Sequence, residues 1–131
     1  MMATRMRSPV GRAVGLGSAK EGVDHWWAQR ITAIALVPLS LWFVSAIIGL
    51  VGGDLETVQN WVSLPLPAIL LILLLIATFY HVSLGLQVVI EDYVHTELVK
   101  LGLVVVLRLL CFGFAVAGIF AVVSIAVGAT G

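Results

Sequence analysis

Charged side chains are scarce in this sequence. Asp, Glu, Lys and Arg make up 11% of the 131 residues, whereas hydrophobic residues make up 61%, and the mean hydropathy is +1.15. Three long stretches, 31–53, 57–90 and 109–131, contain no charged residue. A water-soluble domain of this size could not bury so much apolar surface inside itself. The composition therefore excludes an ordinary soluble domain and indicates a membrane protein.

Cysteine is almost absent as well. The one cysteine, Cys111, lies inside an apolar stretch, where we expect a small buried side chain. The chain thus has no disulfide framework and no Cys-x-x-Cys-His site for a c-type haem. It also lacks the set of cysteines that binds an iron–sulfur cluster and has no glycine-rich phosphate-binding loop.

The apolar stretches predict an all-α integral membrane protein with three transmembrane helices. Each stretch reaches the ~20 residues that a span needs, and none has the alternating pattern of a barrel strand. We predict spans at about 31–51, 66–90 and 101–127, with a short polar loop over 52–65. Residues 1–22 are predicted to be a flexible tail, and 23–131 the membrane domain.

The basic residues predict the orientation of these spans. All seven fall on one side of the predicted helices: Arg5, Arg7, Arg12, Lys20, Arg30, Lys100 and Arg108. By the positive-inside rule that side is cytoplasmic, so the N-terminus is cytoplasmic and the C-terminus periplasmic. The first twenty residues have no apolar core of a secretory signal, although their Arg and Ser could imitate a transit peptide. We expect a bacterial inner membrane, with the mitochondrial inner membrane as the alternative.

A polar side chain inside a transmembrane span costs free energy and often has a function. His81 is the clearest example in this sequence. It lies eleven residues before Asp92, or ~16 Å along a helix. Neutral imidazole is a standard axial ligand of haem iron, but a histidine bonded to a neighbouring helix is the alternative. His25 and His95 are expected at the membrane surface, too far away to ligate the same iron. If His81 binds haem, a second polypeptide must supply the other ligand.

Three more residues have both a functional and an ordinary interpretation. Arg30 could pair with a haem propionate, or anchor the helix at the lipid headgroups. At the end of the second span, Tyr93 could donate to a quinone carbonyl with Asp92 relaying a proton, or both could be ordinary interfacial residues. Arg108, inside the third span, is expected to extend toward the membrane surface.

Two segments resemble one known family. Residues 22–34 (GVDHWWAQRITAI) are similar to the segment that leads into the first helix of the hydrophobic membrane anchor of succinate dehydrogenase (complex II), with its Arg-x-Thr-Ala. Residues 81–94 (HVSLGLQVVIEDYV) are similar to the family pattern His-x-x-x-Gly-x-x-x-Val/Ile-x-x-Asp-Tyr-Val. The cytochrome b subunit of the same complex, its other membrane anchor, is the nearest alternative, but its His-Arg-x-Thr-Gly motif is absent here.

The resemblance implies a function and a set of partners. His81 would be an axial ligand of haem b with the cytochrome b subunit supplying the other, Arg30 would lie near the propionates, and Tyr93 would contribute to the ubiquinone site beside Asp92. The chain would be a non-catalytic anchor in the bilayer for the iron–sulfur and flavoprotein subunits, with no nucleic-acid partner. The alternative function is a small membrane transporter or pore-forming protein without a cofactor.

Overall fold

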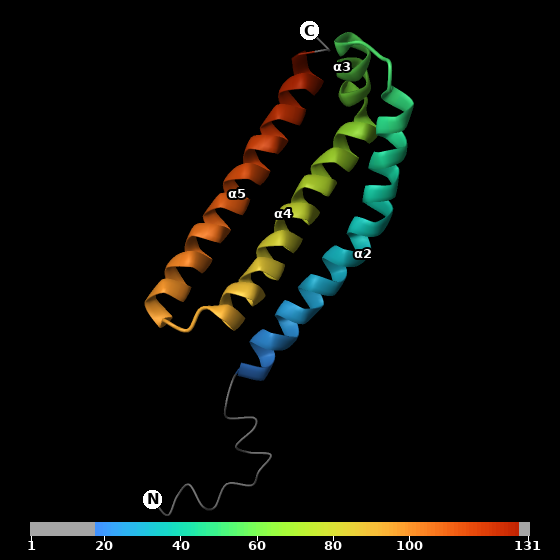
Figure 1. The fold of residues 1–131 in the computed structure, drawn as a ribbon. Helices are drawn as coiled ribbons and strands as arrows, with labels where there is room; N and C mark the ends of the chain where they lie inside the picture. The colour runs from blue at the N-terminus through green and yellow to red at the C-terminus, as the bar shows by residue number, and fades with distance from the viewer. Residues whose placement is uncertain (1–17, 129–131) are drawn as a thin grey trace, which may run out of the picture.

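The computed structural model describes residues 18–128, and side chains from residue 22 onward. The described chain forms four helices: α2 (Ser18–Leu50), α3 (Leu55–Ser63), α4 (Pro65–Tyr93) and α5 (Glu97–Gly128). The tail predicted over 1–22 falls largely outside the described residues, and its last residues already belong to α2. In Figure 1, α2, α4 and α5 run up and down beside one another, and α3 lies at one end.

The three predicted transmembrane helices are confirmed. Gly22–Leu50, Pro65–Tyr93 and Glu97–Gly128 are each long and apolar enough to cross a membrane. The helices extend beyond the predicted spans, most clearly in α2, because the first predicted span was begun after Arg30, at the start of a charge-free stretch. Backbone hydrogen bonding continues past the hydrocarbon into the headgroup layer, where charged side chains are tolerated. Orientation across the membrane remains a prediction.

The prediction of a polar loop over 52–65 is wrong in part, because residues Leu55–Ser63 form the short helix α3. Asp54 caps it, since its carboxylate accepts hydrogen bonds from Thr57 N at 2.9 Å and from Thr57 Oγ1 at 2.6 Å. These bonds lower the pKa of the exposed Asp54 carboxyl below its ordinary value. The turn before this cap uses Gly52 at a φ of +86°, a conformation that glycine adopts without strain. The segment was predicted to be a loop because many of its residues are polar, but it forms a capped amphipathic helix.

Helix α4 lies between the other two long helices and contacts both (Figure 1). Against α5, Phe79 stacks on Phe114 at 6.2 Å between ring centroids. A side chain at Gly118 would meet the methyl groups of Leu75 at 3.0 Å, so this glycine permits the close approach of the two helices. Cys111 is buried in the same contact, as predicted.

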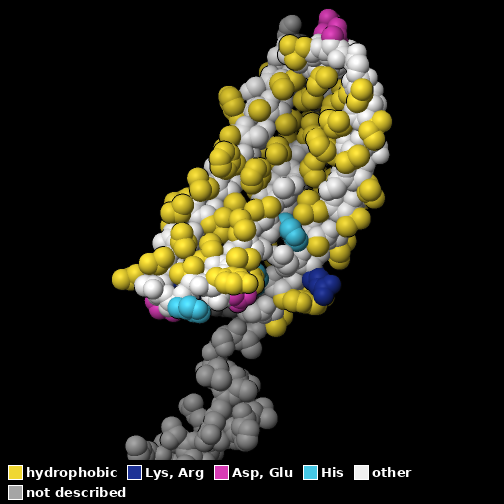
Figure 2. Space-filling view, in the orientation of Figure 1, with side chains coloured by type: hydrophobic (Ala, Val, Ile, Leu, Met, Phe, Trp, Pro, Cys, Tyr) yellow, Lys and Arg dark blue, Asp and Glu magenta, His cyan; other side chains and the backbone are white. Residues whose placement is uncertain are grey.

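The surface of the bundle is apolar along its length and charged at its ends. Figure 2 shows hydrophobic side chains over the middle of the molecule and most charged and histidine side chains gathered near the end where α2 begins. Only a few large hydrophobic residues of the described chain are buried, and many on all three long helices are exposed. An apolar exterior of this extent requires lipid or other membrane helices around it.

Candidate functional site

His81 lies in the middle of α4 and is held by a residue from a different helix. Its Nδ1 is 2.9 Å from Thr32 Oγ1 on α2, across 49 residues of sequence. Thr32 is buried, with 8% of its surface exposed, and it is the one buried polar residue of the described chain. Because a buried polar group in a span is costly, the pairing gives this threonine a reason to be there.

The hydrogen-bond geometry assigns the tautomer of His81. The Thr32 hydroxyl lies 2.8 Å from the carbonyl oxygen of Ala28 and 3.0 Å from that of Gln29, and both carbonyls can only accept. The two short contacts favour donation of the single hydroxyl proton to the backbone, and Oγ1 then accepts the proton of Nδ1. The neutral ring then carries its free lone pair on Nε2.

One ring nitrogen of His81 is left available to a ligand from outside this chain. Nε2 has no hydrogen-bond partner among the described residues and is not one of the buried unpaired atoms, so it reaches the surface of this chain. Gly85, one turn further along α4, would with an added Cβ meet only Gln29 Nε2, at 3.6 Å. Imidazole with a metal-binding lone pair, its other nitrogen held by a hydroxyl, is a suitable donor for haem iron.

The other two histidines do not approach His81. His25 lies on the same stripe of α2 as Thr32 but seven residues, or ~10 Å, away along the axis. Its Nε2 is buried and unpaired, as is Oε1 of Gln29 one turn later. His95 is exposed in the connection between α4 and α5. Among the described residues no group of three or more His, Cys, Asp and Glu forms a metal site.

Arg30 is exposed and points away from the Thr32–His81 pair. It lies two positions before Thr32, a step of about 200° around an α-helix. Its guanidinium lies over the ring of Trp26, with 5.1 Å from Cζ to the ring centroid. The ion pair found among the described residues joins Lys100 to Glu97, so Arg30 has no carboxylate partner there. Its position leaves the guanidinium able to bind an anionic group that approaches α2 from outside.

Asp92 and Tyr93 occupy the last turn of α4 and are both exposed, Tyr93 to 78%. They lie ~16–18 Å along the helix from His81. Neither makes a hydrogen bond to another described side chain. The structure therefore separates the predicted haem ligand from the predicted quinone pair, and leaves the pair on an open edge of this chain.

Sequence reasoning missed Thr32 as a site residue. The signal was present, because a hydroxyl in the first span and an imidazole in the second are both polar groups that need partners in lipid. What the sequence does not contain is the relative rotation of the two helices that brings them together.

Comparisons with known proteins agree over nearly the whole chain. The family described as succinate dehydrogenase/fumarate reductase transmembrane subunit matches residues 4–126. A succinate dehydrogenase hydrophobic membrane anchor subunit from Rickettsia bellii is 37% identical over 116 residues, which cover 88% of this chain and 93% of that protein. The subunit of the same name from Paracoccus denitrificans is 31% identical over 127 residues, covering 95% and 96%. A succinate dehydrogenase membrane anchor subunit from Reclinomonas americana is 30% identical over 94 residues, covering 70% and 78%.

Proposed function

The chain belongs to the succinate dehydrogenase/fumarate reductase transmembrane subunit family, and we propose that it binds haem b jointly with a second membrane anchor and helps to form the site of ubiquinone reduction. Its general role, a membrane anchor of succinate dehydrogenase, follows from the family and from its three transmembrane helices. The transporter and pore alternatives have no comparable support.

The observation that carries the haem proposal is the hydrogen bond from His81 Nδ1 to Thr32. With the Thr32 proton on a backbone carbonyl, this bond supports the tautomer whose Nε2 can ligate iron, and it orients the ring from a second helix, as partners of ligating histidines commonly do. Haem iron, when bound, accepts and returns single electrons. His81 would hold the iron, and the hydroxyl of Thr32 would keep the ligand in place.

The partner anchor, the cytochrome b subunit, would supply the other residue that holds the haem. Within this chain His25 and His95 lie at other levels along the helix axes. His81 Nε2 opens to the surface of the chain, where another membrane helix can pack. Arg30, which has no carboxylate partner among the described residues, would bind a propionate at the rim of the macrocycle.

Tyr93 and Asp92 would supply one wall of the quinone site. The phenolic O–H can donate a hydrogen bond to a ubiquinone carbonyl oxygen, and the carboxylate beside it can pass on a proton. Reduction to ubiquinol takes two electrons and two protons, and this pair would handle only protons and binding. The electrons would come from succinate oxidation through the flavoprotein and iron–sulfur subunits. The exposure of both residues leaves room for these partners to close the site.

The cellular setting agrees with this role. The relatives from Rickettsia and Paracoccus are bacterial anchor subunits, which supports a bacterial inner membrane. With the N-terminus cytoplasmic, the end that carries Tyr93 would face the soluble subunits. The described basic residues Arg30, Lys100 and Arg108 lie in the halves of their helices nearest that end.

The experiment that tests the haem proposal is the substitution His81→Ala in the co-expressed complex. We expect the b-type haem spectrum to be lost or strongly reduced, because one of the two axial ligands is missing. His95→Ala is the matched control and should leave the spectrum unchanged, since His95 is exposed in a connection. Full haem content and an unaltered spectrum in His81→Ala would refute the assignment.

A further inference from the structure

A cleft on the bundle remains outside the haem and quinone proposals. It has two parts that share Tyr80, Leu84 and Arg108. The larger, of about 640 Å³, is an apolar groove between α4 and α5. The smaller, of about 440 Å³, is a polar chamber that also reaches α2. Both volumes lie in the range of small-molecule sites. An apolar groove that opens into a polar chamber suits an amphiphilic ligand.

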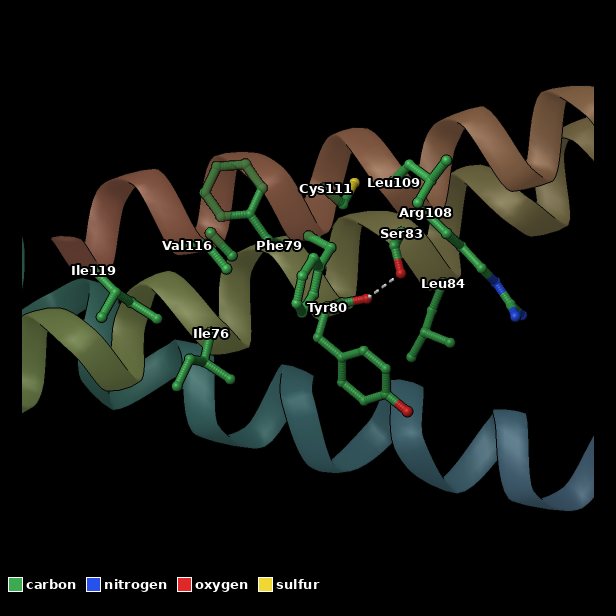
Figure 3. Close-up of a pocket in the computed structure, with 12 residues that line it drawn as sticks. Ile76, Phe79, Tyr80, Ser83, Leu84, Arg108, Leu109, Cys111, Val116 and Ile119 are labelled. Carbon is green, nitrogen blue, oxygen red and sulfur yellow. Dashed lines mark hydrogen bonds between the residues drawn. The ribbon is translucent and has the colours of Figure 1, made fainter.

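Figure 3 shows how the side chains line the groove. Ile76 and Ile119 lie at one end, and Arg108 lies at the other. The Arg108 side chain extends away from the isoleucines toward the end of the bundle where α2 begins. Phe79 and Val116 are among the apolar side chains between these ends. The lining therefore changes from apolar to cationic along the direction of the helices.

Arg108 is a cation at an unusual depth. It lies eleven residues into the 32-residue helix α5. A helix of that length is about 48 Å long, so centred on a hydrocarbon layer of ~30 Å it places Arg108 roughly 7 Å inside the layer. Charges at such positions are rare and are satisfied by a partner group or by reaching the headgroups.

The partner of Arg108 within the described chain is neutral. Its Nη2 donates to Gln87 Oε1 at 2.7 Å, and Gln87 Nε2 donates in turn to Glu91 Oε1 at 2.8 Å. A guanidinium has five N–H donors, so this bond leaves four. Gln87 thus orients the guanidinium without neutralising it, and the remaining donors suit a phosphate, which arginine can bind through two parallel bonds.

The polar chamber contributes two further features. His25 lines it, and Nε2 of that histidine is buried without a hydrogen-bond partner. Asp24 also lines it, one residue nearer the start of α2. A buried unpaired nitrogen calls for a ligand atom or water, and the Asp24 carboxylate, which lines the same chamber as Arg108, favours a ligand that carries both charges.

We propose that this cleft binds a zwitterionic phospholipid, with its phosphate against Arg108, its ammonium group toward Asp24 and one acyl chain along the α4–α5 groove. His81 lines neither part of the cleft. A neutral quinone would offer no charge to either Arg108 or Asp24, and a lipid of net negative charge would meet the carboxylate of Asp24. The headgroup of this lipid would lie slightly deeper in the membrane than those of the surrounding lipids, because its phosphate contacts a guanidinium inside the hydrocarbon layer.

The test measures phospholipid retained by the purified complex, with all subunits co-expressed and extracted in mild detergent. Arg108→Gln removes the phosphate contact, and Ala115→Phe fills the apolar groove, which Ala115 lines. We expect each variant to lose about one phosphatidylethanolamine per complex relative to the unaltered protein. Lys100→Gln is the control: this lysine carries the same charge on the same helix, pairs with Glu97 and lines neither part of the cleft.

Two outcomes would overturn the proposal. Equal phospholipid content in the unaltered protein and both variants would do so, and this is also the result expected if a partner protein fills the cleft. Loss of phosphatidylglycerol instead of phosphatidylethanolamine would overturn the zwitterionic assignment. Subunit ratios on a gel and succinate oxidation with an artificial acceptor verify assembly. If Arg108→Gln does not assemble, Ala115→Phe decides, because it leaves every polar group in place.

Discussion

Thr32 shows how one hydroxyl determines the chemistry of a neighbouring imidazole. Its proton goes to a backbone carbonyl of its own helix, so its oxygen can only accept from His81 Nδ1. The ring is thereby held in one tautomer and one orientation before any metal binds. A ligand that is already oriented loses less entropy on binding, and its basicity is raised by the bond that it donates.

Substitution of Thr32 tests this role. In Thr32→Val the shape of the side chain is retained, but Nδ1 loses its acceptor and the ring can place its proton on Nε2. We expect haem affinity to fall by roughly 10–100-fold, the range seen when such supporting partners are removed. The midpoint potential of haem that remains should rise, because a less basic ligand stabilises ferric iron less. Haem titration and a redox titration measure the two effects.

Thr32→Ser supplies the control, since serine keeps the hydroxyl and loses only a methyl group. It should restore both the affinity and the potential. If the valine and serine variants behave alike, the hydroxyl has no role in holding the ligand.

At the level of single residues the sequence predicted His81 but not Thr32. A histidine in a span stands out because its polarity is costly in lipid, whatever its neighbours are. A threonine does not, because it can satisfy its own hydroxyl on the preceding turn of the helix, as Thr32 partly does. Its second bond depends on helix packing, which the spacing of residues does not contain.

Helix α4 carries two candidate functions on one continuous element. His81 lies in the middle of α4, and Tyr93 is the last residue of that helix, ~18 Å further along the axis. The side chains between them make no described hydrogen-bonded path from one to the other. Changes at the quinone end should therefore leave the haem ligand undisturbed.

Tyr93→Phe tests this separation. We expect ubiquinone reduction to be impaired, because the hydrogen bond to a quinone carbonyl is lost, while succinate oxidation with an artificial acceptor and the haem spectrum are retained. Tyr80→Phe is the comparison at the other tyrosine of the chain, which lines the proposed lipid cleft and lies outside the predicted quinone site. Loss of the artificial-acceptor activity in Tyr93→Phe would point to failed assembly and contradict the assignment.

The elements themselves were predictable where composition is extreme. Long charge-free stretches predict the three spans because a membrane is the usual environment that covers so much apolar surface. The ends of the helices are harder to predict, because they extend into the headgroup layer, where charged residues are tolerated. Helix α3 was missed because its nine residues are mostly polar and its stability depends on the Asp54 cap and on contacts such as Trp61 against Trp42. Those contacts form only after the spans have folded back beside each other.

As a whole, the chain is an open bundle. Its large hydrophobic side chains are mostly exposed, Nε2 of His81 reaches the surface, and Tyr93 and Asp92 lie on an edge. These features have a common explanation if the chain is one half of a heterodimeric anchor. Lipid would cover part of the apolar surface, and the cytochrome b subunit would cover the part that carries the haem ligand.

The most direct test is the reduced-minus-oxidised absorbance spectrum of membranes that contain only this chain, only the cytochrome b subunit, or both. We predict a low-spin, six-coordinate b-type spectrum only when both chains are present, because each would supply one axial ligand. The same spectrum from this chain alone would contradict the account, since the second ligand would then lie within these 131 residues.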